Sequence, residues 1–172
     1  MASTNKNLIV AYFENEHAAA MAADGLKDWD NACQDIKLGG VGIVTREHGE
    51  VKTHMIGGRA AGKGAKWGTI IGVVAGIFTG GLSIIGGAVA GLAAGAVTGA
   101  LFHKRLGMSD DDKARLDDHL KGGGAALAVM TGEDAVAATK AELASISGDV
   151  ENFSVPPETM NALEEAASSE SP

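Results

Sequence analysis

The chain has 172 residues, of which 45% are hydrophobic but only 4% aromatic, and 25 are glycine. This length allows one ordinary domain, or a small domain with an insertion, and excludes two full hydrophobic cores. The formal net charge of -8 argues against a protein that binds the phosphate backbone of nucleic acids. The single cysteine, Cys33, excludes an intrachain disulfide framework, and the polar N-terminus predicts no signal peptide, so we expect a cytoplasmic chain.

The first third of the chain predicts a strand, a helix and a hairpin. Residues 8–13 form an apolar run typical of a buried strand, and residues 14–16 then open a helix. The apolar face of this helix is expected to hold Ala18, Met21, Ala22 and Leu26. Residues 37–46 and 51–56 favour strands, and the spacing between them, with a glycine in the turn, predicts antiparallel pairing.

Residues 67–102 contain no Asp, Glu, Lys, Arg or His, although both flanking regions are rich in charge. A glycine inside a soluble helix costs about 1 kcal/mol relative to alanine. Glycines nevertheless recur here at every fourth position in two series, which indicates helices that approach closely or lie in lipid. The glycines expected to form this helix-packing surface are Gly64, Gly68, Gly72, Gly76, Gly80, Gly87, Gly91, Gly95 and Gly99.

A turn-like sequence at residues 79–83 separates the two series, so we expect residues 57–105 to form an inserted helical hairpin, a glycine zipper. Its second arm, residues 83–102, has the ~20 apolar residues that span a bilayer, whereas the first arm is shorter. Basic residues at both ends predict that a spanning hairpin leaves both termini on the cytoplasmic side of the inner membrane. The residues expected at the membrane interface are Arg59, Lys63, Lys66, Trp67, Phe102, Lys104 and Arg105.

Alanine and glycine are only weakly hydrophobic, so a second interpretation stays open for the hairpin. In that interpretation it is the buried seam of a soluble cytoplasmic assembly, such as a shell, filament or scaffold subunit. Both interpretations predict a homo-oligomer. Only the first one adds membrane lipid as a partner.

After the insertion, Ser109 is expected to cap a helix that starts with three aspartates, with Asp112 at the capping-box position, and ends at residues 122–124. Residues 125–131 predict a buried strand and residues 132–146 an alanine-rich helix. A last strand is expected at residues 150–155.

The order βαββ, insertion, αβαβ favours an α+β fold, a ferredoxin-like sandwich with helices on one face of an antiparallel sheet. Residues 1–56 and 106–155 would form the two parts of this domain, and residues 156–172 an acidic flexible tail.

No set of catalytic residues emerges from the sequence. Residues 57–63 match the G-x-x-x-x-G-K phosphate loop, but Gly64 stands where a magnesium-binding Ser or Thr is needed, so a nucleotide-binding module is the weakest alternative. None of the five histidines, which are His17, His48, His54, His103 and His119, forms a metal-binding pair at helical spacing. Asp117, Asp118 and His119, with residues 110–112, could attract a divalent cation, but the sequence has no calcium loop with its closing Glu. A solvated helix face therefore explains them better. We therefore expect no enzyme activity, metal, cofactor, nucleic acid or small-molecule substrate.

Several segments carry a resemblance to a known family. They are residues 7–13, the run into Lys66-Trp67-Gly68, the glycine-rich hairpin, residues 106–111 and residues 120–127. Through these segments the chain resembles the bacterial domain of unknown function 1269 family, which is described as membrane-associated. The resemblance covers residues 7–155. The chain is also similar, more distantly, to the general stress protein 17M-type domain. The resemblance implies a ferredoxin-like domain with an inserted hairpin, membrane association and expression under stress. It offers no activity or catalytic residue to carry over.

Overall fold

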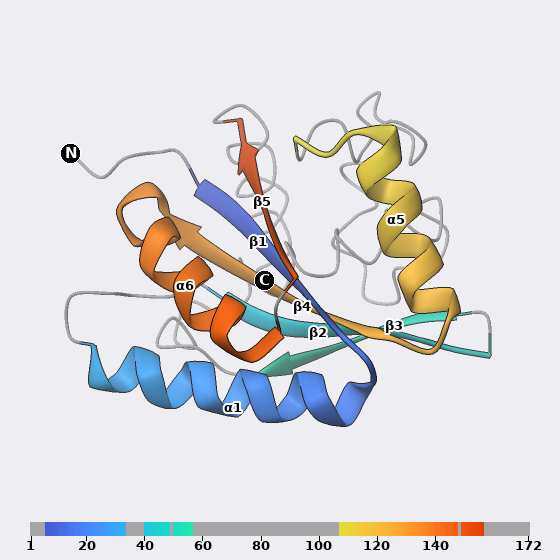
Figure 1. Ribbon diagram of the computed structural model, residues 1–172, viewed down its shortest axis with the longest axis horizontal. Coiled ribbons are helices and arrows are strands. Elements are labelled where there is room, and N and C mark those ends of the chain that lie inside the picture. Colours follow the sequence, from blue (N-terminus) through green and yellow to red (C-terminus); the bar gives the residue numbers. More distant parts are fainter. Residues whose placement is uncertain (1–5, 34–39, 49, 57–106, 148, 157–172) are drawn as a thin grey trace, which may run out of the picture.

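The computed structural model of the chain describes residues 6–33, 40–48, 50–56, 107–147 and 149–156 (Figure 1). The described residues form one sheet with helices packed on it. The fold class is therefore α+β, as predicted.

Five strands lie in the order β3-β2-β4-β1-β5, and every neighbouring pair is antiparallel. The strands are β1 (Lys6–Phe13), β2 (Gly40–Glu47), β3 (Glu50–Ile56), β4 (Ala125–Gly132) and β5 (Val150–Val155). All five predicted strands are confirmed. The start of the second predicted strand, residues 37–39, lies outside the described residues.

The helices in the described part of the chain are also those that the sequence predicts. They are α1 (Glu16–Ala32), α5 (Asp110–Lys121), the short 3-10 helix η2 (Glu133–Ala135) and α6 (Val136–Ser147). The predicted helix at residues 132–146 is thus a 3-10 turn followed by an α-helix.

The connections form two crossovers. β1 and β2 run parallel with β4 between them, and β4 and β5 run parallel with β1 between them. α1 makes the first crossover, and η2 with α6 makes the second. β3 extends the sheet at one edge as the hairpin partner of β2, with Glu47 opposite Glu50. His48 turns this hairpin with a positive φ of 53°. The described chain stops at Ile56 on this edge strand and resumes at Gly107.

The main core lies between one face of the sheet and helices α1 and α6. Ile9 and Leu127 in the central strands pack with Leu26 of α1 and Leu143 of α6, all at 0% exposure. The opposite face is buried as well, since every residue of β4 from Ala125 to Met130 is at most 1% exposed. An unbroken apolar strand is typical of a sheet that is covered on both faces.

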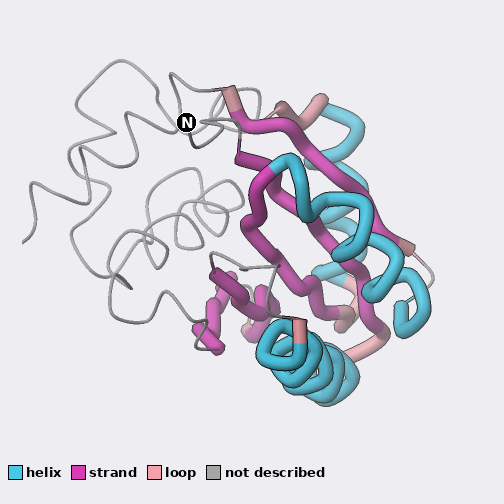
Figure 2. Tube along the Cα trace, turned by 90° about the vertical axis from the view of Figure 1, so that its left-hand side faces the viewer, coloured by secondary structure: helices cyan, strands magenta, loops and turns pink. Residues whose placement is uncertain are grey.

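Helix α5 lies on the other face of the sheet from α1 (Figure 1). Phe13 points into the main core, whereas its neighbour Tyr12 meets His119 of α5, with ring centroids 5.1 Å apart. Successive strand residues point to opposite faces, so the two contacts place α5 opposite α1 and α6. Figure 2 shows α1 nearly end-on below the strands. The expectation that all helices share one face is therefore wrong for α5.

Helix α1 begins at the N-cap Asn15, whose side chain accepts a hydrogen bond of 2.8 Å from the Ala18 backbone N–H. Its buried positions are Ala19, Ala22, Ala23, Leu26 and Asp30. Ala22 and Leu26 were expected on this face, and Ala18 packs against it while partly buried. Met21, however, is 64% exposed, because it lies two residues after the buried Ala19, about 200° around the helix and so on the opposite face. The prediction for Met21 is wrong.

Helix α5 has the predicted capping box. Ser109 accepts from the Asp112 backbone N–H at 3.1 Å, and the Asp112 carboxylate accepts from the Ser109 backbone N–H at 2.9 Å. The helix ends at Gly122, and Gly123 follows in the left-handed conformation with φ 89°. This arrangement satisfies the free backbone groups at both helix ends.

Among the described helices, none is both long and apolar enough to cross a bilayer. The hairpin expected at residues 57–105 and the tail after residue 156 lie outside the described residues.

Candidate functional site

The residues that the sequence singles out for helix packing and for the membrane interface all fall between positions 57 and 106. This range holds the glycines from Gly64 to Gly99, the basic and aromatic positions from Arg59 to Arg105, and the phosphate-loop-like residues 57–64. All of them lie outside the described residues. Their expected roles therefore remain predictions.

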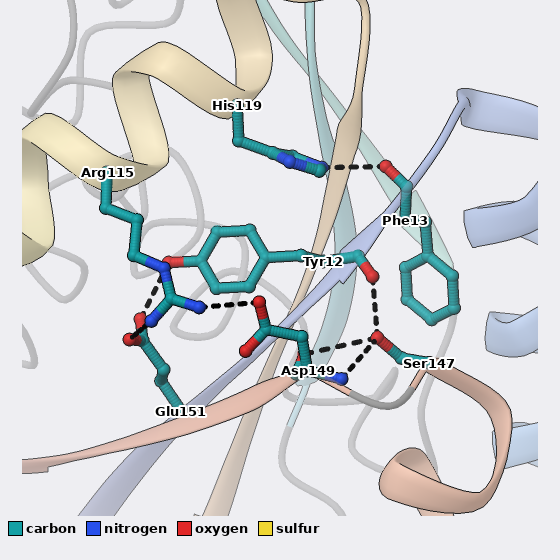
Figure 3. A network of polar contacts seen from close by, with 7 residues as sticks. All are labelled: Tyr12, Phe13, Arg115, His119, Ser147, Asp149 and Glu151. Atoms are coloured by element: carbon teal, nitrogen blue, oxygen red, sulfur yellow. Dashed lines mark hydrogen bonds and ion pairs between the residues drawn. The ribbon is translucent and has the colours of Figure 1, made fainter.

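Within the described part of the chain, polar side chains gather where β1 ends, between α5 and the start of β5 (Figure 3). Tyr12 comes from β1, Arg115 and His119 from α5, and Asp149 and Glu151 from the β5 region. We call these five residues the Tyr12 cluster. Tyr12 and Glu151 are 139 positions apart in the sequence, so only the pairing of β1 with β5 brings them together.

The phenol of Tyr12 lies at the centre of this cluster. Its hydroxyl donates a hydrogen bond of 2.7 Å to Oε2 of Glu151. The His119 ring meets the Tyr12 ring edge to face, and the Arg115 guanidinium carbon lies 5.3 Å from the ring centroid. Burial and the hydrogen bond to Glu151 raise the pKa of Tyr12 well above its ordinary value. The phenol therefore stays protonated and acts as a donor.

Arg115 joins two carboxylates of the β5 region to α5. Its Nη2 donates to Oδ2 of Asp149 at 2.6 Å, and its Nη1 donates to Oε1 of Glu151. The hydrogen bond to Asp149 and the negative charges of both partners raise the pKa of Arg115. The fork of guanidinium donors suits this arrangement because it engages two acceptors at once.

His119 bonds to the backbone of β1 instead of facing solvent. Its Nε2 lies 2.7 Å from the carbonyl oxygen of Phe13. Gly124 provides the space for the ring, since a Cβ at that position would lie 2.4 Å from the same Nε2. The interpretation of His119 as part of a solvated helix face is therefore wrong.

Ser147 fixes the corner between α6 and β5. Its hydroxyl donates to the Tyr12 carbonyl oxygen at 2.6 Å, and the Tyr12 backbone N–H donates to the Asp149 carbonyl oxygen at 3.1 Å. Both bonds hold the end of β1 against the start of β5. This corner sets the positions of the carboxylates that Arg115 contacts.

The opposite flank of α5 is held by a second set of charges. Nη1 of Arg46, on β2, donates to Oδ1 of Asp117 at 2.7 Å, and Nζ of Lys121 lies 2.8 Å from Oδ2 of the same carboxylate. Burial alone would raise the pKa of Asp117, but Lys121 and Arg46 outweigh it and lower the pKa below its usual value. Asp117 is thus also engaged with the protein and does not belong to a solvated face.

The remaining candidates are dispersed. Cys33 is the C-cap of α1 and is partly buried, His17 is exposed on α1, and His48 is exposed in the β2–β3 turn. His103 lies outside the described residues, as does the side chain of His54. Across the described ranges, no group of three His, Cys, Asp or Glu side chains is arranged to hold a metal ion.

Sequence reasoning missed the Tyr12 cluster as a unit. The pattern that could have indicated it is the run of three i, i+4 pairs in α5, which are 115 with 119, 116 with 120, and 117 with 121. The middle pair is leucine and both outer pairs are polar. Such a pattern predicts a helix with a narrow apolar stripe between two polar flanks.

The fold and this cluster define an α+β protein in which a charged helix is fixed across one face of an antiparallel sheet. The chain belongs to the family described as protein of unknown function (DUF1269), whose model matches residues 61–168, more than half of the chain. The match begins after β3, so the first 60 residues lie outside it. No curated protein and no solved structure matches the chain.

Proposed function

We propose that the protein is a non-enzymatic homo-oligomer that associates with a membrane and assembles through glycine-zipper hairpins formed by residues 57–105. The α+β domain stays on the cytoplasmic side of the inner membrane with both termini. Expression under stress, which the family resemblance implies, is part of the same proposal.

The observation that carries the proposal is the 36-residue stretch without charge, flanked by basic residues and lined with glycines at every fourth position. Glycine at this spacing lets two helix backbones pack closely, as small residues do between membrane helices. In water the same glycines would cost about 1 kcal/mol each, so this composition suits a segment whose stability comes from packing or lipid.

The topology supports an insertion into a ferredoxin-like domain. Without β3 and α5, the described elements follow the order β1, α1, β2, β4, α6, β5, and their strands lie in the order β2-β4-β1-β5. This is the arrangement of two interlocked split βαβ units. The extra elements, β3 and α5, flank the proposed hairpin in the sequence. An insertion there interrupts none of the central strand pairs.

The chemistry of the Tyr12 cluster supports a structural role for these polar groups. A phenol that acts as a general base or nucleophile needs a lowered pKa, whereas the pKa of Tyr12 is raised. The guanidinium of Arg115 donates hydrogen bonds to Asp149 and Glu151, and both partners belong to the same domain. The cluster therefore serves to hold α5 on the sheet.

The test is the double variant Gly72→Leu/Gly91→Leu, measured by light scattering of the detergent-extracted protein. We expect the oligomer mass to fall to that of the monomer, because leucine keeps the helices apart. The near-UV circular dichroism should keep its shape, since both positions lie outside the α+β domain.

The matched control is Val74→Leu/Ala93→Leu. Each of these positions lies two residues after a glycine, about 200° around the helix, so the added bulk points away from the contact. This variant should keep the oligomer mass. An unchanged mass in the glycine variant would contradict the proposal, and extraction of the native protein without detergent would favour the soluble assembly.

A further inference from the structure

Helix α5 differs from α1 in how it is attached to the sheet. α1 buries Ala19, Ala22, Ala23 and Leu26 in the main core, whereas α5 buries only Leu116 and Leu120. Eight of the 12 residues of α5 are Asp, Lys or Arg. The apolar contact of α5 is therefore narrow, and its other contacts are polar.

The polar contacts lie on both sides of the leucine stripe. Arg115 and His119 face β1 and β5 on one flank, while Asp117 faces Arg46 of β2 on the other. Consecutive helix residues are about 100° apart, so positions 115 and 117 flank Leu116 symmetrically. Polar contacts thus join α5 to β1 and β5 on one side of the central strand β4, and to β2 on the other side.

The ion pairs between α5 and the sheet differ in their exposure to solvent. The side chains of Arg115 and Asp149 are 50% and 51% exposed, whereas those of Arg46 and Asp117 are 19% and 27% exposed. Exposed pairs are weak and are screened by salt. Beneath the helix, Val44, Ala126 and Tyr12 lie side by side across β2, β4 and β1, and all three are buried.

We propose that α5 is an ionic latch, a helix that detaches from the sheet as a unit when its charge pairs are screened, while the sheet, α1 and α6 stay folded. Detachment uncovers the apolar row of Val44, Ala126 and Tyr12. The inference rests on described residues alone and is independent of the function proposed for residues 57–105.

Amide hydrogen exchange of the full chain, followed by mass spectrometry at 50 mM and 500 mM NaCl, tests the latch. Local opening lets amides exchange without global unfolding. We expect the amides of α5 to exchange about five times faster at high salt. The amides of β1 and β4 should keep their rates.

Arg115→Gln tests the same latch at low salt and should speed exchange in α5 to a similar extent. Lys113→Gln is the matched control, because it removes the same charge from the same helix but takes part in none of the contacts above. It should leave the rates unchanged. The latch is overturned if α5 and the central strands exchange at one common rate at both salt concentrations, or if both variants act alike.

Discussion

At the scale of single residues, two buried threonines differ in what their hydroxyls contact. Thr131 in β4 is 1% exposed, and its Oγ1 has no hydrogen-bond partner in the described structure. Thr139 in α6 is fully buried, and its Oγ1 donates to the Ala135 carbonyl oxygen at 2.7 Å. A buried polar group without a hydrogen-bond partner lowers the free energy of unfolding, whereas a buried polar group that has a partner raises it.

Thr131→Val is therefore expected to raise the free energy of unfolding by about 1 kcal/mol, because valine has the same shape without the hydroxyl. Thr139→Val should lower it by about 1 kcal/mol, because it removes a hydrogen bond. Urea midpoints followed by far-UV circular dichroism compare the two variants. Shifts of the same sign would contradict this description of the two hydroxyls.

Tyr12 is the only tyrosine in the chain, so the absorbance of tyrosinate near 295 nm reports this residue alone. Its raised pKa means that the folded protein keeps the phenol proton while the unfolded chain loses it near pH 10. The corresponding stability is fully present below pH 10 and is lost as the pH rises, by up to about 1.4 kcal/mol per pH unit.

We therefore expect the native protein at pH 11 to show little tyrosinate absorbance, and the urea-unfolded protein to show nearly all of it. Tyr12→Phe should lose the alkaline decline in stability that the phenol causes. A native titration centred near pH 10 would show that the phenol is not buried against Glu151.

At the scale of elements, α5 depends on the glycines at its two ends. Gly107 has φ 79°, and a Cβ there would lie 2.6 Å from the Ser154 carbonyl oxygen. Gly123 has φ 89°, but nothing lies within 4 Å of the corresponding Cβ position. Both positions have a left-handed backbone conformation, which glycine adopts without strain. Only at Gly107 does the missing Cβ also allow a close approach to β5.

Gly123→Ala should cost about 1 kcal/mol of stability, because alanine adopts the left-handed region at that cost. Gly107→Ala should cost at least twice as much, since the strand backbone must also move. Thermal unfolding of the two variants measures the difference. Equal losses would indicate that the contact with Ser154 does not constrain the start of α5.

The order of the described elements could be predicted from the sequence because each has a local pattern. The apolar run of β1, the capping box at Ser109 and the glycines after Lys121 all act within a few residues. The face occupied by α5 could not be predicted in this way. Its charged residues suggest exposure, and the partners of Arg115 and Asp117 lie 34 and 71 positions away.

Met21 shows, within one helix, the same limit of prediction from local sequence patterns. The spacing of apolar residues in α1 allows several neighbouring faces, because alanine is common on all of them. The sheet then selects the face with Ala22 and Leu26, and Met21 is left exposed. Local periodicity predicts that a face exists, and packing decides which one is buried.

At the scale of the whole molecule, an acidic α+β domain and an uncharged glycine-rich segment share one chain of 172 residues. In the domain, hydrogen bonds and ion pairs between described residues hold the charged helix α5 on the sheet. The polar residues of the domain are therefore explained by their part in its stability. The glycine series has no such explanation within a soluble monomer, because glycine disfavours helices in water. Assembly through that segment is therefore the central claim of the proposed function.

Carbonate-washed membrane fractionation of the native protein, followed by mass determination of the fraction that contains it, tests this claim most directly. We predict that the protein stays in the washed pellet and is released only by detergent, as a particle several times the mass of one chain. A monomer in the supernatant would contradict both membrane association and assembly. A large particle in the supernatant would contradict membrane association and would indicate that the glycine zipper is the buried seam of a soluble assembly.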